Sequence, residues 1–444
     1  MQKQQLKFFD LSMIVVSLVI GMGIFKTPAS VAASADSPFI FFLAWGLGAV
    51  ISICGALTFA EIGSRLPVSG GYYRVFSHCY HPAFAFMLNG TILISNAASV
   101  AGVALIGAEY CAPFVFGVEK PEHQETNHLL FAAAMIIFFF ALNLLGLKTS
   151  ARTQNVLTVF KLVVVTTLCF SVFSKVPEAQ TVAQTPTPAL NGFWASLGMC
   201  LIPISFTYGG YQQTINFGGE VENSRRIMPR AIITGMLIVA FLYMTINYAY
   251  FHVIGFTQLK STTAIGAVLS SQIFGSIGGK VLSMLLFFSV LAYVNVGLLS
   301  NPRVIMAMSE EKTLPGIFSK HSQRFNVPVW SLVAFTVITA AVLFFAKTFE
   351  TLVKYVIFLD ALGFVFAAAT IFILRHRKTG ETSDIYKVSA YPIVPALFII
   401  AYLGITAAVI AAGWKYALLG LCVFASFIFP YFLFRYLNKK KDGN

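Results

Sequence analysis

Two glycines stand in the middle of the first apolar segment of the chain, in Gly21-Met22-Gly23-Ile24-Phe25. Inside a bilayer, each glycine weakens a helix and uncovers backbone N–H and C=O groups that lipid cannot hydrogen-bond. Such a break is tolerated where it lines a polar cavity. The N–H groups at the start of a half-helix favour an anion, for example a carboxylate. We therefore expect a polar cavity with an anion site at this break.

A second apolar segment is interrupted in a similar way. It contains Pro203 and the pair Gly209-Gly210, together with several polar side chains at membrane depth. Close packing of helices is an alternative explanation for either glycine pair alone. Two such breaks, five apolar segments apart, are the pattern of two repeats with inverted topology.

Two ionisable residues lie within apolar segments. Lys161 follows Val159-Phe160, and a lysine at that depth costs about 2.5 to 3.5 kcal/mol on insertion scales, which favours a functional role. The alternative is that its ammonium reaches the interface, about two helical turns away. Asp360 follows Leu359. It either faces the polar path, where it would select cationic ligands, or pairs with a lysine such as Lys354.

The elements that position these residues are membrane-spanning helices. The chain has 444 residues, of which 57% are hydrophobic and 11% charged, and its mean hydropathy is +0.79. This composition predicts an integral membrane protein with no separate soluble domain. Twelve apolar runs are long enough to cross a hydrocarbon core of about 30 Å. They lie near residues 11–33, 38–62, 83–112, 129–147, 155–174, 193–217, 230–254, 271–300, 330–346, 352–374, 392–412 and 415–436.

The net charge of +13 is distributed as membrane topology requires, so nucleic acid is not an expected partner. With twelve spans, 21 of the 30 Lys and Arg residues fall on the side of the N-terminus. The positive-inside rule then predicts a multi-pass protein of the cell membrane with both termini in the cytoplasm. The six cysteines lie in or beside apolar runs without paired spacing, which favours small core residues over disulfides or metal ligands. No cofactor is expected.

Several stretches, in this order and spacing, together resemble the amino acid-polyamine-organocation (APC) superfamily, and within it the L-type amino acid transporter branch. The similarity covers the first ten spans and is weaker in the last two. The stretches that carry it are Gly21-Met22-Gly23-Ile24-Phe25, Gly55-Ala56-Leu57 with Ala60-Glu61, Ser69-Gly70-Gly71-Tyr72-Tyr73, Phe206 to Tyr211, and Pro229-Arg230-Ala231-Ile232.

The resemblance implies an all-α integral membrane fold with twelve transmembrane helices. Residues 1–444 would form a single domain built on a five-plus-five inverted repeat, in which helices 1 and 6 are broken. The first repeat would cover about residues 8–175 and the second about residues 192–376. Helices 11 and 12, at about residues 390–437, would lie outside the repeat.

The resemblance also implies roles for residues at the two breaks. Backbone amides of the first break would bind a substrate carboxylate, and carbonyls of both breaks its ammonium. Phe206 would close over the substrate as a gate, and Thr207, Gly210 and Tyr211 would help to form a pocket for its side chain. The amide set is Gly21, Met22 and Gly23, and the carbonyl set is Val19, Ile20, Phe206 and Gly209.

Three positions refine this comparison. The family usually has a small hydroxyl residue between the first two glycines, and Met22 lacks that side-chain donor. Tyr211 stands where tryptophan is frequent. Related transporters have a lysine in span five whose ammonium takes the place of a sodium ion, which implies that Lys161 bridges to the first broken helix and that transport is sodium-independent.

The implied function is a permease that moves a neutral α-amino acid by alternating access, as an exchanger or a proton-coupled symporter. The alternatives are a permease for cationic amino acids or polyamines and a membrane amino acid sensor with the same fold. An ion channel or an enzyme is disfavoured, because neither a filter sequence nor a catalytic histidine pattern is visible. The expected partners are an amino acid and the lipid bilayer. No cysteine lies between Ala112 and Thr167, so we expect a monomer without a disulfide-linked heavy chain.

Overall fold

The protein is built of helices. The computed structural model describes residues 5–21, 23–115, 121–173, 192–262, 265–322, 327–346 and 349–442. In these residues, ten helical segments are long and apolar enough to cross a membrane, and Val329–Phe345 is a shorter apolar helix. The first half contains α1 (Phe8–Val19), α2 (Gly23–Ser34), α3 (Pro38–Arg65), α4 (Gly71–Cys79), α5 (Pro82–Val115), α6 (Pro121–Leu144), α7 (Leu147–Cys169) and η1 (Phe170–Phe173). The second half contains α8 (Phe193–Thr207), η3 (Tyr211–Asn216), η4 (Gly218–Glu220), α9 (Ser224–Ile254), α10 (Phe256–Leu259), α11 (Ile265–Ser300), α12 (Pro302–Glu310), η5 (Gly316–Ser319), α13 (Val329–Ala346), α14 (Phe349–His376), α15 (Ile393–Ser426) and α16 (Ile428–Asp442).

Local sequence explains where several helices begin and bend. Ser37 precedes α3, and its hydroxyl accepts a hydrogen bond from the Ile40 N–H at 3.3 Å, while Pro38 occupies the first helical position. α15 leaves helical geometry at Gly413, close to the boundary expected between the last two apolar runs. Helices therefore begin and bend where a cap or a glycine allows it.

The first apolar segment and the segment around Gly209-Gly210 are each interrupted. α1 ends at Val19 and α2 begins at Gly23, and α8 ends at Thr207 before the chain turns into η3. Gly210 has φ +111°, and a Cβ built there would come within 2.2 Å of the Leu18 carbonyl oxygen. The two interruptions thus touch backbone to backbone, at a position that only glycine fits.

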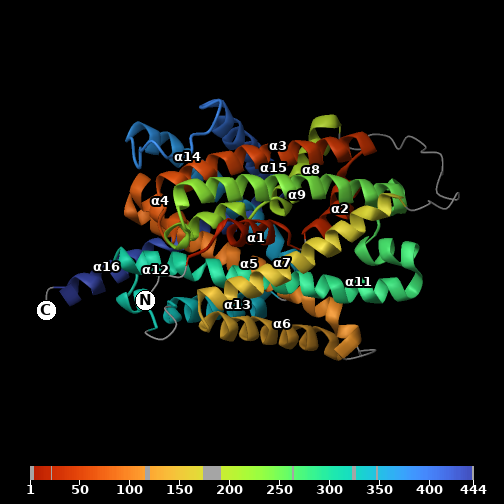
Figure 1. Cartoon of the computed structure of the whole chain (residues 1–444), viewed down its shortest axis with the longest axis horizontal. Helices are drawn as coiled ribbons and strands as arrows, with labels where there is room; N and C mark the ends of the chain where they lie inside the picture. Colours follow the sequence, from red (N-terminus) through yellow and green to blue (C-terminus); the bar gives the residue numbers. More distant parts are fainter. Residues whose placement is uncertain are drawn as a thin grey trace.

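The interrupted segments lie at the centre of the bundle (Figure 1). α1 packs against α7, α9, α11 and η3, and α2 packs against α8. The helices α5, α14 and α15 pack against one another, and both α14 and α15 also contact α8. Helices from distant parts of the sequence therefore surround the two interruptions.

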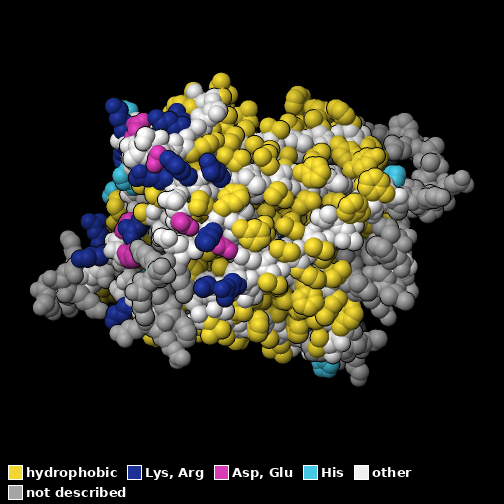
Figure 2. Space-filling view, viewed as in Figure 1, with side chains coloured by type: hydrophobic (Ala, Val, Ile, Leu, Met, Phe, Trp, Pro, Cys, Tyr) yellow, Lys and Arg dark blue, Asp and Glu magenta, His cyan; other side chains and the backbone are white. Residues whose placement is uncertain are grey.

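Charge and apolar surface are separated on the outside of the molecule. Figure 2 shows Lys and Arg side chains gathered toward the end where Figure 1 marks both termini, and apolar side chains over the middle. At the basic end, the fully buried Glu61 carboxylate forms ion pairs with the guanidinium groups of Arg65 and Arg375. The N–O distances are 2.8 Å and 2.7 Å. The apolar middle is what a lipid-facing surface requires.

Candidate functional site

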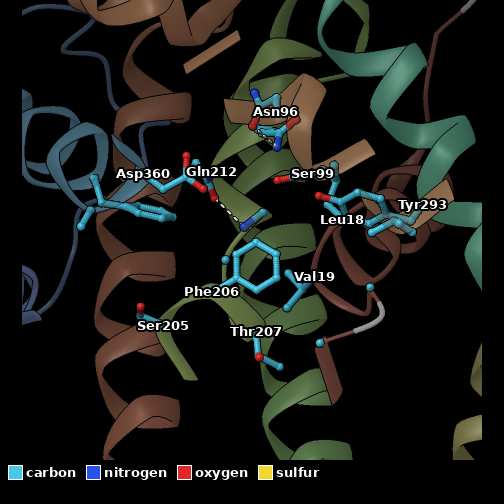
Figure 3. Close-up of a pocket in the computed structure, with 18 of the residues that line it drawn as sticks. Leu18, Val19, Asn96, Ser99, Ser205, Phe206, Thr207, Gln212, Tyr293 and Asp360 are labelled. Atoms are coloured by element: carbon cyan, nitrogen blue, oxygen red, sulfur yellow. Dashed lines mark hydrogen bonds between the residues drawn. The ribbon is translucent and has the colours of Figure 1, made fainter. Parts of the chain in front are cut away.

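A pocket opens where the two interruptions meet, and four more helices complete its described wall (Figure 3). The first interruption and the second contribute most of its backbone, while α5, α11, α14 and α15 contribute side chains. The wall consists of Leu18, Val19, Gly21, Gly23, Asn96, Ser99, Val103, Ser205, Phe206, Thr207, Gly209, Gly210, Gln212, Gln213, Tyr293, Asp360, Ala361, Phe364 and Tyr402.

The start of α2 lies in the pocket wall, where its free N–H groups would favour an anion. α2 begins at Gly23, and the N–H groups in the first turn of a helix lack intrahelical partners and carry partial positive charge. A Cβ on Gly23 would lie 2.8 Å from the Thr207 hydroxyl, so the start of α2 directly touches the end of α8. The Gly21 N–H is not free for an anion in this structure, because it donates to the Val19 carbonyl at 2.7 Å. Met22 lies outside the described residues.

Two of the carbonyls expected to bind an ammonium, those of Val19 and Ile20, already have side-chain donors. The Tyr243 hydroxyl donates to the Val19 carbonyl at 3.0 Å and lies 3.3 Å from the Thr207 carbonyl, so one side chain of α9 bridges both interruptions. The Val19 carbonyl also accepts the Gly21 N–H, so both of its lone pairs are in use. Val19 lines the pocket, as do Phe206 and Gly209, whereas Ile20 does not. Fewer carbonyl groups are therefore available for a substrate ammonium than the resemblance implies.

Lys161 binds the first interruption from outside the pocket. Its side chain is completely buried in α7, and its ammonium lies 2.5 Å from the Ile20 carbonyl oxygen and 3.4 Å from the Ser17 hydroxyl. A buried charge requires such partners. Lys161 therefore joins α7 to the last turn of α1, which is the geometry expected for a bridge to the first break.

The aromatic residues of the second interruption occupy different places. Figure 3 shows the Phe206 ring amid the labelled wall residues, where a gate would stand. Tyr211 is fully buried and is not part of the wall. Its ring lies 5.9 Å from the Phe59 ring and 6.1 Å from the Phe364 ring. Tyr211 thus supports the wall residue Phe364 from behind.

A group of three side-chain amides lies beside the pocket. The Gln213 amide donates to Asn96 at 3.1 Å, Asn96 donates to Asn301 at 2.6 Å, and Asn301 donates back to Gln213 at 3.4 Å. Asn96 and Gln213 belong to the pocket wall. Asn96 therefore both lines the pocket and joins α5 to other elements by hydrogen bonds.

Asp360 is the one acidic residue of the described pocket wall. Its Oδ1 accepts a hydrogen bond from the Ser95 hydroxyl at 2.5 Å. The alternative partner, Lys354, has a side chain outside the described part. Of the two hypotheses, the wall position agrees with Asp360 facing the polar path.

Other wall residues carry no signal in the sequence. Ser99, Tyr293 and Tyr402 come from the long apolar helices α5, α11 and α15, where the sequence does not distinguish the face that meets the pocket. Gln212 and Gln213 lie in the polar stretch after the second break, but they were not predicted to be site residues. The Gln212 side chain accepts the Gly210 N–H at 2.9 Å and so satisfies the interrupted backbone.

Comparison with known proteins agrees with this architecture. The family model described as amino acid permease matches residues 6–432. The serine/threonine exchanger SteT of Bacillus subtilis is 29% identical over 87% of this chain and 86% of its own length. The mouse b(0,+)-type amino acid transporter 1 is 27% identical over 95% and 86%, and the human cystine/glutamate transporter is 29% identical over 87% and 76%. The chain therefore belongs to the amino acid permease family of the APC superfamily and is a multi-pass membrane protein for amino acid transport, not an enzyme.

Proposed function

We propose that this protein is a sodium-independent permease that exchanges α-amino acids across the cell membrane by alternating access, with neutral side chains of small to medium size among its substrates. One observation carries the proposal, namely the pocket in which the start of α2 meets the end of α8. A helix start attracts a carboxylate and a helix end attracts an ammonium, which are the two charges every α-amino acid carries.

The position of Lys161 supports independence from sodium. Its ammonium already supplies a positive charge to the Ile20 carbonyl, where a coupling cation would otherwise bind. Exchange, rather than proton symport, is supported by the similarity to a serine/threonine exchanger. Phe206 in the wall would act as the gate.

Topology and partners complete the proposal. We place the basic end of the molecule in the cytoplasm, with both termini, because the positive-inside rule favours this orientation. α8 with η3 would form the sixth span and bring the total to twelve, and two repeats of five spans would precede α15 and α16. The six cysteines are free, and none lies between Ala112 and Thr167, so the protein would act as a monomer without a disulfide-linked heavy chain.

Counterflow into proteoliposomes tests the function. Purified protein is reconstituted into vesicles that contain a mixture of unlabelled neutral amino acids, and uptake of each radiolabelled amino acid is measured with and without sodium. We expect uptake that depends on the internal amino acid and is equal in sodium and in choline buffer.

Each other result has a defined meaning. Uptake driven by an imposed proton gradient into empty vesicles would replace exchange by proton symport. Binding in a thermal-shift assay without counterflow would indicate a sensor. Dependence on sodium would contradict the role given to Lys161. Vesicles without protein provide the background.

A further inference from the structure

Asp360 places a carboxylate deep in the membrane and on the pocket. α14 ends at His376 on the basic end, and Asp360 lies 16 residues earlier (376 − 360), which is about 24 Å along a helix. The residue is only partly buried, and it lines the pocket together with Ala361 and Phe364 of the same helix. Figure 3 shows its carboxylate among the side chains around the pocket.

No cation of the described part neutralises this carboxylate. Its hydrogen-bond partner there is the neutral Ser95 hydroxyl, and none of the ion pairs found among the described residues includes Asp360. No described Lys, Arg or His side chain belongs to the pocket wall. The buried Lys161 ammonium is already hydrogen-bonded at the end of α1, to the Ile20 carbonyl and the Ser17 hydroxyl.

The charge of Asp360 is also surplus to an amino acid's two backbone charges. The start of α2 suits the carboxylate, and the carbonyls at the end of α8 suit the ammonium. The carboxylate of Asp360, the one charged side chain of the described wall, has no counterpart on a neutral amino acid. An ionised carboxylate in a low-dielectric site is stabilised by an opposite charge that binds there.

The surroundings of Asp360 fit a long side chain with a cationic end. Tyr293, Phe364 and Tyr402 provide aromatic wall, and the rings of Phe364 and Tyr402 lie 4.8 Å apart. Such rings accommodate methylene groups and attract cations at their faces. Ser99 and Gln212 add neutral polar groups to the same wall.

We propose that Asp360 is a specificity-determining residue that binds the side-chain ammonium or guanidinium of a dibasic amino acid, so that the permease carries cationic as well as neutral amino acids. The inference rests on the proposed function, because it adds a substrate class to the same pocket. The α-carboxylate and α-ammonium bind at the two interruptions, and the side chain extends toward α14.

Matched amino acids separate charge from shape. Lysine is compared with norleucine, and arginine with citrulline, as competitors of counterflow of a labelled neutral amino acid. For the wild type we expect lysine to compete at a concentration at least about tenfold below that of norleucine, since a hydrogen bond to a charged group has that effect on affinity. In Asp360→Asn the two should compete equally, while norleucine competition changes less than about threefold.

Control variants distinguish recognition from folding. Asp36→Asn makes the same chemical change between α2 and α3, outside the pocket wall, and should keep the wild-type preference for lysine. Asp360→Glu keeps the charge and should keep part of that preference. Thermal stabilisation of the purified protein by lysine should disappear in Asp360→Asn, which gives a readout independent of transport.

The outcomes separate this inference from the proposed function. If the wild type shows counterflow of neutral amino acids but no preference for lysine, the inference is overturned. The proposed permease function is then unaffected. The same holds for a preference that survives in Asp360→Asn, or for a variant that changes only the pH dependence of transport. Absence of counterflow for every amino acid would overturn both.

Discussion

At the scale of single residues, Lys161 is the clearest link between membrane burial and function. A lysine with no exposed surface is tolerated because its ammonium binds the Ile20 carbonyl and the Ser17 hydroxyl at the end of α1. Those carbonyl and hydroxyl oxygens belong to the helix that forms the pocket. Lys161 therefore holds the end of α1 at the first interruption and is not part of the described pocket wall.

Removal of this ammonium should impair transport more than it impairs folding. Lys161→Met keeps the length and apolar stem of the side chain but leaves the Ile20 carbonyl without its donor. We expect the counterflow rate to fall at least about tenfold, the loss that follows from one hydrogen bond to a charged group. Lys148→Met, at an exposed position near the start of the same helix, should transport as the wild type does. Wild-type counterflow by Lys161→Met would contradict the assignment.

At the scale of elements, the two interruptions depend on each other. Gly210 approaches the Leu18 carbonyl, Gly23 approaches Thr207, and Thr207 donates to the Thr27 hydroxyl at 2.8 Å. Tyr243 then bridges the Val19 and Thr207 carbonyls. A change at one interruption is therefore expected to affect the other.

Gly210→Ala tests this contact. Alanine is strained at φ +111°, and its Cβ would overlap the Leu18 carbonyl at 2.2 Å. We expect the variant to lose most counterflow and to unfold at a lower temperature in detergent. The control is Gly198→Ala in α8, where a Cβ meets nothing within 4 Å and should not reduce stability. If both alanine variants transported equally well, the backbone contact would not matter for function.

The sequence predicted elements better than it predicted the pocket wall. Glycine and proline mark the interruptions because they act on the backbone locally, so the region of the site was visible. α6 begins at Pro121 and α7 at Leu147, each about eight residues before the apolar run, because helices continue into polar surroundings beyond the bilayer core. Ser99, Tyr293 and Tyr402 were missed, because a helix that is apolar on all sides gives no indication of which face meets the pocket.

At the scale of the whole molecule, the basic end is closed by a buried ionic cluster. The Glu61 carboxylate of α3 accepts hydrogen bonds from Arg65, from Arg375 of α14 and from the Val388 N–H before α15, at 2.7 to 2.9 Å. The Arg375 guanidinium also lies 3.8 Å from the centre of the Tyr391 ring. One side chain thus ties together both halves of the chain at the end that we place in the cytoplasm.

Glu61→Gln should therefore destabilise the whole bundle. The Glu61 side chain has no exposed surface and that of Arg65 is 2% exposed, so the variant leaves buried positive charge without its partner. Loss of one member of a buried ion pair lowers the free energy of unfolding by about 3 to 5 kcal/mol. Thermal unfolding in detergent, followed by circular dichroism, would show this as a lower midpoint.

A surface pair provides the comparison, because burial is what gives the Glu61 cluster its effect. Glu381 and Lys387 form an ion pair at 2.8 Å, but their side chains are 41% and 54% exposed, and water screens such a pair. Glu381→Gln should leave the unfolding midpoint unchanged. Equal midpoints for the two variants would show that the cluster does not hold the basic end together, and closure there would have to depend on helix packing alone.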